Sequence, residues 1–482
     1  MLKSGPNVSG VIERVWKTVR VWAGLVCLCT AQQLFSEESV QPSALDSLQA
    51  GETAAPAVTN KDSTKSPASA SRLDRVGGLP GSIAGGVGNV NPIAATNQTI
   101  DMARWTARRK QLKLGDGNYG FTGLPILIYR PASKSWSYGV RLQWADYERR
   151  PYRYKLTFNW VRSTAGKVSL FGRLRVPRIS GTGFGVRLFV ATTRDVRARY
   201  FGLGNGSVFD PNLADPNHAD FIDENYYFYV LERPRAIMSL LRHIHGPVSM
   251  SAGFGLERSE IEPRGARSFY LDDGAREGVI DGVTGFLSLT MQWDSRDDPT
   301  IPKRGAFHEW SYETSRNSLI GLFFEEIDFD RYTLTDSRYY PLGERLNLAN
   351  RVIFEGLKGS VPLYAFGEIG GSRRAKGVGG GDTVRGFDSQ RFTDNIRTVT
   401  NTELRCRLHA HRLKKQWLEW SGVFFVDSGQ VSPGVSDLSL AGNHWSSGTG
   451  LRLYWNADFV VRLDLAFGDE RGSASFKYRN IF

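Results

Sequence analysis

The chain lacks aromatic residues between Ser36 and Arg104, although its 482 residues include 27 Phe, 18 Tyr and 12 Trp. Residues 43–72, SALDSLQAGETAAPAVTNKDSTKSPASASR, are mostly Ala, Ser, Thr and Pro. Such a segment cannot bury enough apolar surface to offset the entropy of folding. We therefore expect residues 32–115 to be a low-complexity, largely disordered periplasmic leader that precedes the folded domain.

The N-terminal region also lacks an apolar run of about 20 residues, the length that a membrane-spanning helix needs. Its apolar run, VWAGLVCLCTA (21–31), is about half that length, follows four Lys and Arg residues and closes on small residues. This arrangement is typical of a secretory signal peptide. We predict that residues 1–31 are such a signal, cleaved after Ala31.

Cysteine and histidine are scarce, with 3 and 7 residues respectively. Removal of the signal would leave Cys406 as the single cysteine, so no disulfide within the chain is expected. His409 and His411 stand close together, but no third metal ligand accompanies them in the sequence. Solvation of this basic segment is a simpler interpretation than a metal site, and we expect no metal.

Motifs of catalytic sites are absent as well. The sequence contains no Gly-x-Ser-x-Gly, no His-Glu-x-x-His and no phosphate-binding loop, so we expect no enzymatic activity and no cofactor. The formal net charge of +12 comes from Lys and Arg residues that are scattered singly. A nucleic-acid partner is therefore not expected, because such partners are bound by clustered basic residues or recognised motifs.

The second half of the chain contains segments in which apolar and polar residues alternate strictly. In FVVRLDLAFG (459–468), Phe and aliphatic residues share one face, while Arg462, Asp464 and Ala466 share the other. A soluble sandwich with its apolar face inward would also alternate in this way. Charges of both signs on the polar faces, aromatic residues at strand ends and segments of about 9–11 residues favour a membrane barrel instead. The predicted fold class is all-β: a transmembrane antiparallel β-barrel over residues 116–482, with sixteen strands.

Several short motifs then point to one family. VRGF (384–387) stands in a long loop, FVDSG (425–429) lies on the second strand after it, and GTGLRLYW (448–455) on the strand after that. Together with YFGLGNGS (200–207), WDSRDDPTIPKRG (293–305) and a terminal Phe, this order resembles the BamA/TamA-type bacterial surface antigen family of outer-membrane assembly barrels. The resemblance covers the chain from about Phe121 to its end.

The resemblance implies that the long loop folds into the barrel, where Arg385 meets Asp427. The local pattern agrees with this expectation, because both faces around Asp427 are apolar and a buried carboxylate needs a partner. An arginine can bind such a carboxylate with two parallel hydrogen bonds. The expected lock residues are Val384, Arg385, Gly386 and Phe387, with Asp427, Gly429, Gly450 and Arg452 as partners on the inner wall.

The terminal strand, SASFKYRNIF (473–482), is expected to place Phe476, Tyr478 and Phe482 on one apolar face, as the C-terminal signal of such barrels. One feature departs from the family pattern. Assembly barrels carry POTRA domains of some 75–80 residues in the periplasm, and an aromatic-free leader does not predict a packed domain of this kind. The resemblance therefore implies the barrel more directly than the assembly activity.

The resulting hypothesis is a barrel in the outer membrane of a Gram-negative-type bacterium that assists insertion or translocation of proteins or lipids through a lateral seam. The alternative is a channel or a structural barrel without assembly activity. Expected partners are outer-membrane lipids, unfolded outer-membrane proteins or lipids as clients, and the barrel assembly machinery for the protein's own insertion.

Overall fold

The structure is a computed structural model. It describes residues 119–130, 135–148, 152–273, 282–316, 328–413, 416–456, 459–470 and 472–482. All of them belong to one compact unit. The predicted signal peptide, residues 1–31, and the predicted leader, residues 32–115, lie outside the described residues.

Within the described residues, seventeen strands form one sheet in which all pairings are antiparallel. They are β1 (Tyr119–Arg130), β2 (Ser135–Asp146), β3 (Tyr154–Ser163), β4 (Val168–Val176), β5 (Phe184–Arg199), β6 (Phe228–Glu232), β7 (Arg235–His245), β8 (Val248–Pro263), β9 (Gly282–Asp294), β10 (Gly305–Thr314), β11 (Phe329–Pro341), β12 (Leu346–Gly359), β15 (Ile396–Leu413), β16 (Gln416–Ser432), β17 (His444–Trp455), β18 (Phe459–Gly468) and β19 (Gly472–Lys477).

The remaining elements are short. A separate two-stranded sheet pairs β13 (Glu368–Ile369) with β14 (Ala375–Lys376). The helical segments are α4 (Phe269–Asp272), α6 (Leu363–Phe366), η3 (Pro211–Ala214), η4 (Val435–Asp437) and η5 (Leu440–Gly442).

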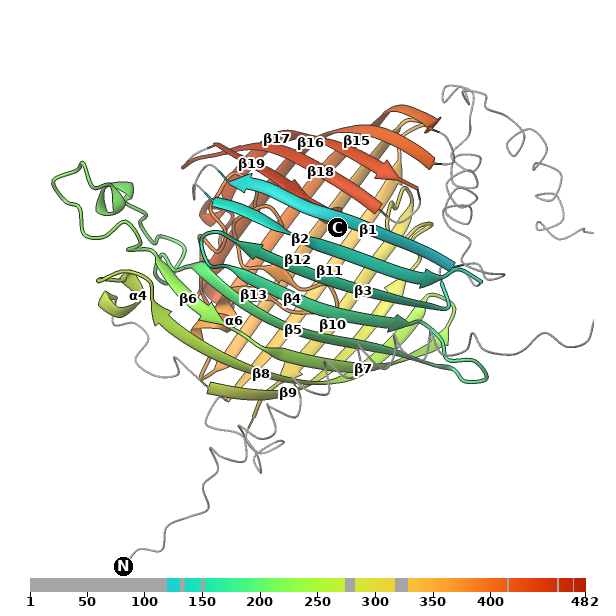
Figure 1. The fold of residues 1–482 in the computed structure, drawn as a ribbon, viewed down its shortest axis with the longest axis horizontal. Helices are drawn as coiled ribbons and strands as arrows, with labels where there is room; N and C mark the ends of the chain where they lie inside the picture. Colours follow the sequence, from blue (N-terminus) through green and yellow to red (C-terminus); the bar gives the residue numbers. More distant parts are fainter. Residues whose placement is uncertain are drawn as a thin grey trace, which may run out of the picture. The chain divides into compact units, whose positions relative to one another are not determined.

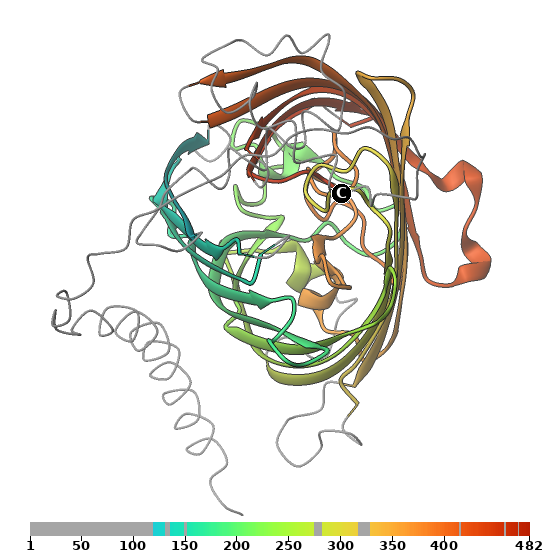
Figure 2. The same cartoon turned by 90° about the vertical axis from the view of Figure 1, so that its right-hand side faces the viewer.

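Strands that follow one another in the chain pair side by side, and the sheet curls into a barrel (Figures 1 and 2). One position is shared, because β6 and β7 both pair with β5 and β8. They are separated by Arg233 and by Pro234, which has no backbone N–H to donate to a neighbouring strand. The seventeen described strands therefore occupy sixteen positions around the barrel.

The two outermost strands of this sheet, β1 and β19, lie side by side in both views (Figures 1 and 2). All twelve residues of β1 are in register with β2, and the six residues of β19 are in register with β18. Among the described residues, β1 is in register with β2 alone and β19 with β18 alone. We call this boundary the seam.

Connections of very different length lie at the two ends of the barrel. The longest ones follow β5, β8 and β12, and these three strands all finish at one end of the barrel, which we call the long-loop end. The two-residue turn between β7 and β8 lies at the other, short-turn end. In transmembrane barrels the short turns face the periplasm and the long loops face outward.

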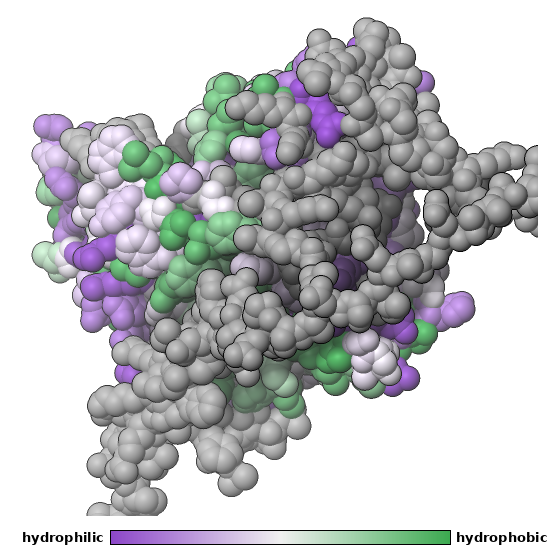
Figure 3. Space-filling view, turned by 45° about the vertical axis from the view of Figure 1, so that its right-hand side comes forward, coloured by the Kyte–Doolittle hydropathy of each residue, from purple (hydrophilic) through white to green (hydrophobic). Residues whose placement is uncertain are grey.

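The two faces of the sheet differ as the alternation predicts. Large apolar side chains are exposed on the outer face, including Leu127, Met238, Leu289, Trp310, Leu334, Phe424, Leu465 and Phe467. Figure 3 shows such apolar residues gathered over the strands, with hydrophilic residues toward the end on the left. The inner face instead carries buried charged residues, including Glu257, Glu313, Arg331, Glu355, Arg397, Glu403, Asp427, Arg452 and Asp464. This inversion, with an apolar exterior and a charged interior, is the pattern of a barrel surrounded by lipid.

No helix among the described residues is both long and apolar enough to span a bilayer.

Candidate functional site

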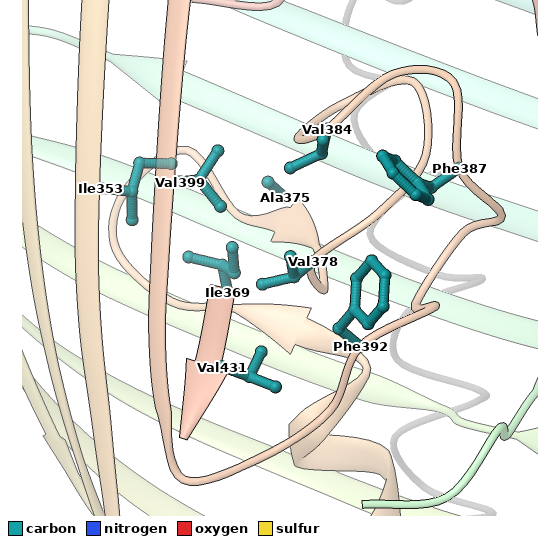
Figure 4. Packing of buried hydrophobic residues seen from close by; sticks show 9 residues of the cluster. All are labelled: Ile353, Ile369, Ala375, Val378, Val384, Phe387, Phe392, Val399 and Val431. Carbon is teal, nitrogen blue, oxygen red and sulfur yellow. The ribbon is translucent and has the colours of Figure 1, made fainter. Parts of the chain in front are cut away.

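The connection between β12 and β15, residues 360–395, folds back into the barrel; we call it the inner loop. Its residues Val378, Val384, Phe387 and Phe392 are each at most 3% exposed. They pack with Ile353 of β12, Val399 of β15 and Val431 of β16, so that loop and wall share one apolar cluster (Figure 4). A loop that forms such a core is held by the burial of its own apolar side chains.

The glycines of this loop have a specific conformational role. Gly379, Gly380 and Gly386 adopt φ angles of 102°, 91° and 94°, a region that residues with a side chain rarely occupy. The bend between them is closed by the Gly380 N–H, which donates to the Val384 carbonyl at 2.9 Å. This tight bend places Arg385 against the wall.

Arg385 is 1% exposed and donates hydrogen bonds to two carboxylates, while a third carboxylate, Asp464, lies 3.5 Å from its Nη1. Its Nε and Nη2 donate to the two oxygens of Asp427 at 2.7 and 2.8 Å, and its backbone N–H donates to the same carboxylate at 3.1 Å. The third nitrogen, Nη1, donates to Glu403 at 2.7 Å. The guanidinium carbon lies 3.4 Å from the centroid of the Phe425 ring. Arg385 is therefore held on its edge by paired hydrogen bonds and on its face by an aromatic ring.

Asp427 has a further partner, which connects the lock to the rest of the loop. The Asn401 side chain donates to Asp427 at 2.8 Å and to the Thr383 carbonyl at 2.6 Å. The Asn401 oxygen in turn accepts from Nε of Arg351 at 3.0 Å. The carboxylate is thus fully engaged, as a buried acidic group must be.

Charges of alternating sign continue from this pair along the wall. Glu403 of β15 accepts from Arg405 at 2.8 Å and from Arg452 of β17 at 3.1 Å, and Arg452 donates to Asp464 of β18 at 2.6 Å. Asp464 also lies 3.3 Å from Arg462. The lock is therefore one part of a network that connects four neighbouring strands.

The structure thus brings together Arg385, Asp427 and Arg452, the three charged residues that the sequence singles out. Sequence reasoning missed Glu403 and Asp464, which hold Arg452 and Arg385 in common. The alternating pattern contained a signal for them. Asp464 lies on the polar face of FVVRLDLAFG, and Glu403 occupies the same alternating series as Arg405.

Two of the predicted wall glycines provide space for different neighbours. A Cβ atom at Gly429 would lie 2.7 Å from Val384, so this glycine admits the inner loop. A Cβ atom at Gly450 would lie 2.3 Å from Asp464 and 2.6 Å from Arg452. Gly450 therefore makes room for the ion pair on the wall, whereas Gly429 makes room for the inner loop.

The first half of the inner loop has its own charged anchors, which sequence reasoning also missed. Arg397 of β15 donates to the Phe366 carbonyl at 2.6 Å and pairs with Glu355 of β12. Glu368 of β13 pairs with Arg233 at 3.0 Å and with Arg235 at 2.9 Å, near the break between β6 and β7. The Arg397 and Glu355 contacts attach the loop to β15 and β12, near the Arg385 lock. The Glu368 pairs attach it to the part of the wall formed by β6 and β7.

At the long-loop end, the inner loop packs against two other connections. Arg391 pairs with Glu470 at 2.7 Å and donates to the Ser207 hydroxyl at 2.8 Å. The Gly204 N–H donates to the Thr393 carbonyl at 2.8 Å, and Phe392 stacks on His444 with ring centroids 3.7 Å apart. The motif YFGLGNGS therefore lies beside the loop that carries VRGF.

The C-terminal residues correct one expectation. Strand β19 ends at Lys477, and the chain then turns inward, as Figure 2 shows. Phe476 is 41% exposed on the outer face, whereas Phe482 is 3% exposed in a cluster with Tyr339 and Ala349. Phe476 contacts Tyr478 edge to face at 5.0 Å.

Phe482 therefore does not share a face with Phe476 and Tyr478, and the prediction of a single terminal strand to residue 482 was wrong. The physical reason lies in polar contacts of the final residues inside the barrel. Arg351 donates to the Ile481 carbonyl at 3.0 Å, and Asn480 donates to the Thr300 carbonyl at 2.9 Å.

Comparison with known families gives one match. The Omp85 superfamily domain matches residues 203–476. None of the curated proteins compared with the chain matches it.

Among solved structures, the chain is similar to BamA from Haemophilus ducreyi lacking POTRA domains 1–3, with a TM-score of 0.45 and 13% identity over 75% of this chain and 69% of that one. CdiB from Escherichia coli has a TM-score of 0.48 and 11% identity over 78% of this chain and 68% of its own. CdiB from Acinetobacter baumannii has a TM-score of 0.41 and 14% identity over 74% of this chain and 59% of its own.

Replacing Arg385 by Ala should destabilise the barrel by about 3–5 kcal/mol, because it leaves the Asp427 carboxylate buried without its main partner. Adding Asp427→Ala should cause little further loss, since the two residues act as a pair. Urea unfolding in detergent micelles measures both effects. Arg338→Ala is the control, because its pair with Asp336 is more than one-third exposed on both sides and is worth about 0–1 kcal/mol. Additive losses in the double variant would show that the pair is not energetically coupled.

Replacing Gly429 by Ala should destabilise the docked loop by about 1–3 kcal/mol, because the added methyl group meets Val384 and the Thr398 carbonyl. Protease cleavage within residues 360–395 should become faster. Gly172→Ala on β4 is the matched control, since a Cβ atom there has no heavy atom within 4 Å. Equal protease resistance of both variants would contradict the close approach of loop and wall.

Proposed function

Because the chain belongs to the Omp85 superfamily, we propose that it assists insertion or translocation of proteins or lipids at the outer membrane, and that clients pass through the seam between β1 and β19. The protein is an outer-membrane β-barrel of a Gram-negative-type bacterium. In the proposed role it acts by binding and strand pairing, without a catalytic step or a cofactor. Its own insertion would depend on the barrel assembly machinery.

The seam is the observation that carries this proposal. Strand β1 has twelve residues paired on one side with β2, and β19 offers only six residues at the other side of the seam. An edge of this kind presents backbone N–H and C=O groups to a further strand. A client segment in extended conformation could add to β1 by the hydrogen bonds of an ordinary antiparallel sheet.

The attachment of the inner loop inside the barrel supports a lateral route over a route along the barrel axis. The inner loop is attached to the wall by Arg385, by Glu368 and by Arg391, each through buried or half-buried ion pairs. Passage along the barrel axis would require several of these pairs to separate, at a cost of several kcal/mol each when they are buried. Opening the seam would leave all of them in place.

A photo-activated crosslinker at Leu127 tests the seam. This residue of β1 is 70% exposed on the outer face, and Met238 of β7, 58% exposed on the same face away from the seam, is the matched control. During addition of an unfolded outer-membrane protein, we expect client adducts at residue 127 and few at residue 238. Equal yields at the two positions would contradict entry at the seam.

Depletion of the protein in cells tests the wider role. We expect the protein or lipid composition of the outer membrane to change, because clients would no longer be inserted. Unchanged composition in both respects would contradict the proposal. If deletion of residues 379–392 also raised planar-bilayer conductance steeply and selectively without any insertion defect, the alternative of a channel would be favoured.

A further inference from the structure

The inner wall formed by β2 to β5 differs from the wall that holds the inner loop. Arg235 faces the interior, because it pairs with Glu368 of the loop. Cross-strand register continues from Arg235 to Ala191, Phe171, Asn159 and finally Arg141 of β2. Since side chains alternate along each strand, the residues at every second position from these also face the interior.

This face carries a group of arginines near the short-turn end: Arg141 on β2, Arg173 and Arg175 on β4, and Arg187 on β5. All four side chains are half-buried. Across the described residues, none of the four forms an ion pair with a carboxylate. On the interior face of β2 to β5, the described acidic side chain is Asp195, which lies toward the long-loop end and pairs with Lys167 at 2.8 Å.

Two of these cations face each other directly. Arg175 and Arg187 are register partners on β4 and β5, a position that places their Cβ atoms about 5 Å apart. Like charges at this separation destabilise a sheet unless an anion lies between them. Arg173 is fixed in the next row by the rings of Phe171 and Phe189, 5.5 and 5.0 Å from its guanidinium carbon.

Arg373 of the inner loop reaches the same region. Its side chain lies inside the barrel, where desolvation by the surrounding wall and the guanidinium groups of Arg296, Arg479 and Arg175 lower its pKa to about 10. Figure 2 shows that the inner loop runs along the opposite wall and leaves β2 to β4 uncovered by its ribbon.

We propose that this cationic wall, formed by Arg141, Arg173, Arg175 and Arg187 with Arg373 above it, is a binding site for phosphate groups. The guanidinium fork matches the oxygens of a phosphate, and several forks can share one dianion. The phosphate is either free or part of an anionic lipid headgroup. A lipid could reach the site from the seam, because β2 is the second strand from that boundary.

The test uses the full chain in dodecyl maltoside micelles, titrated separately with inorganic phosphate and with dihexanoylphosphatidylglycerol below its micelle concentration. We expect saturable binding that becomes about tenfold or more weaker in the double variant Arg175→Gln/Arg187→Gln, since each lost charge-assisted hydrogen bond costs about a factor of ten. Arg242→Gln is the matched control: it removes an exposed cation from the other face of β7, at the same end of the barrel, where the guanidinium contacts Phe184.

Without any added phosphate, the double variant should unfold at a higher urea concentration than the natural protein, because a repulsive pair has been removed. Binding of both probes supports a phosphate site open to either source, and binding of the lipid probe alone assigns it to headgroups. Absence of saturable binding, or equal loss in the double variant and in Arg242→Gln, would overturn the proposal. If the double variant does not fold, Arg373→Gln in the loop gives the same comparison. The inference is independent of the insertion role, which none of these measurements involves.

Discussion

Burial of the Arg385 guanidinium inside the barrel is the constraint from which the arrangement of the inner loop follows. A cation taken out of water costs several kcal/mol unless carboxylates surround it, and Asp427 and Glu403 supply them at 2.7 Å. Glu403 then needs cations of its own, which Arg405 and Arg452 provide. Each buried charge on the wall is therefore neutralised by a neighbouring charge of opposite sign, and this series ends at Asp464 and Arg462 of β18. The inner loop is positioned by this network as much as by its apolar cluster.

The sequence alone indicated which face of a strand is apolar and which is charged. It indicated much less about which charged residues pair with each other. Period-two alternation is a local property, so residues 459–468 already separate an apolar from a charged face. The pairing of Arg385 with Asp427 was implied by the family resemblance, and the apolar faces around Asp427 supported it, because a buried carboxylate needs a partner. Glu355 was missed because its partner Arg397 lies on another strand, 42 residues further along the chain. Glu403 shares an alternating series with Arg405, but its contacts with Arg385 and Arg452 depend on how loop and strands pack in the barrel.

Phe482 shows a second limit. Its alternation with Phe476 and Tyr478 is intact in the sequence, but strand β19 ends at Lys477. Contacts of Ile481 and Asn480 with Arg351 and Thr300 then draw the final residues inward. Periodicity cannot reveal where a strand ends when tertiary hydrogen bonds decide it. The inward turn after Lys477 also leaves β19 with only six residues at the seam. The same turn therefore places Phe482 in the interior and shortens the edge strand of the sheet.

Because the Arg385 lock is buried, it should respond to ionic strength differently from the half-buried arginines of β2 to β5. Mobile ions weaken the attraction between exposed charges over distances of about 8–10 Å at physiological concentrations, but they act much less on pairs from which water is excluded. Arg385 and its two carboxylates are each at most 1% exposed, so the inner loop should stay docked in dilute and concentrated media alike. The half-buried arginines of β2 to β5 remain within reach of dissolved ions. In the same barrel, dissolved ions therefore screen the charges of the wall that holds the inner loop very little. They screen the charges of the wall formed by β2 to β5 much more.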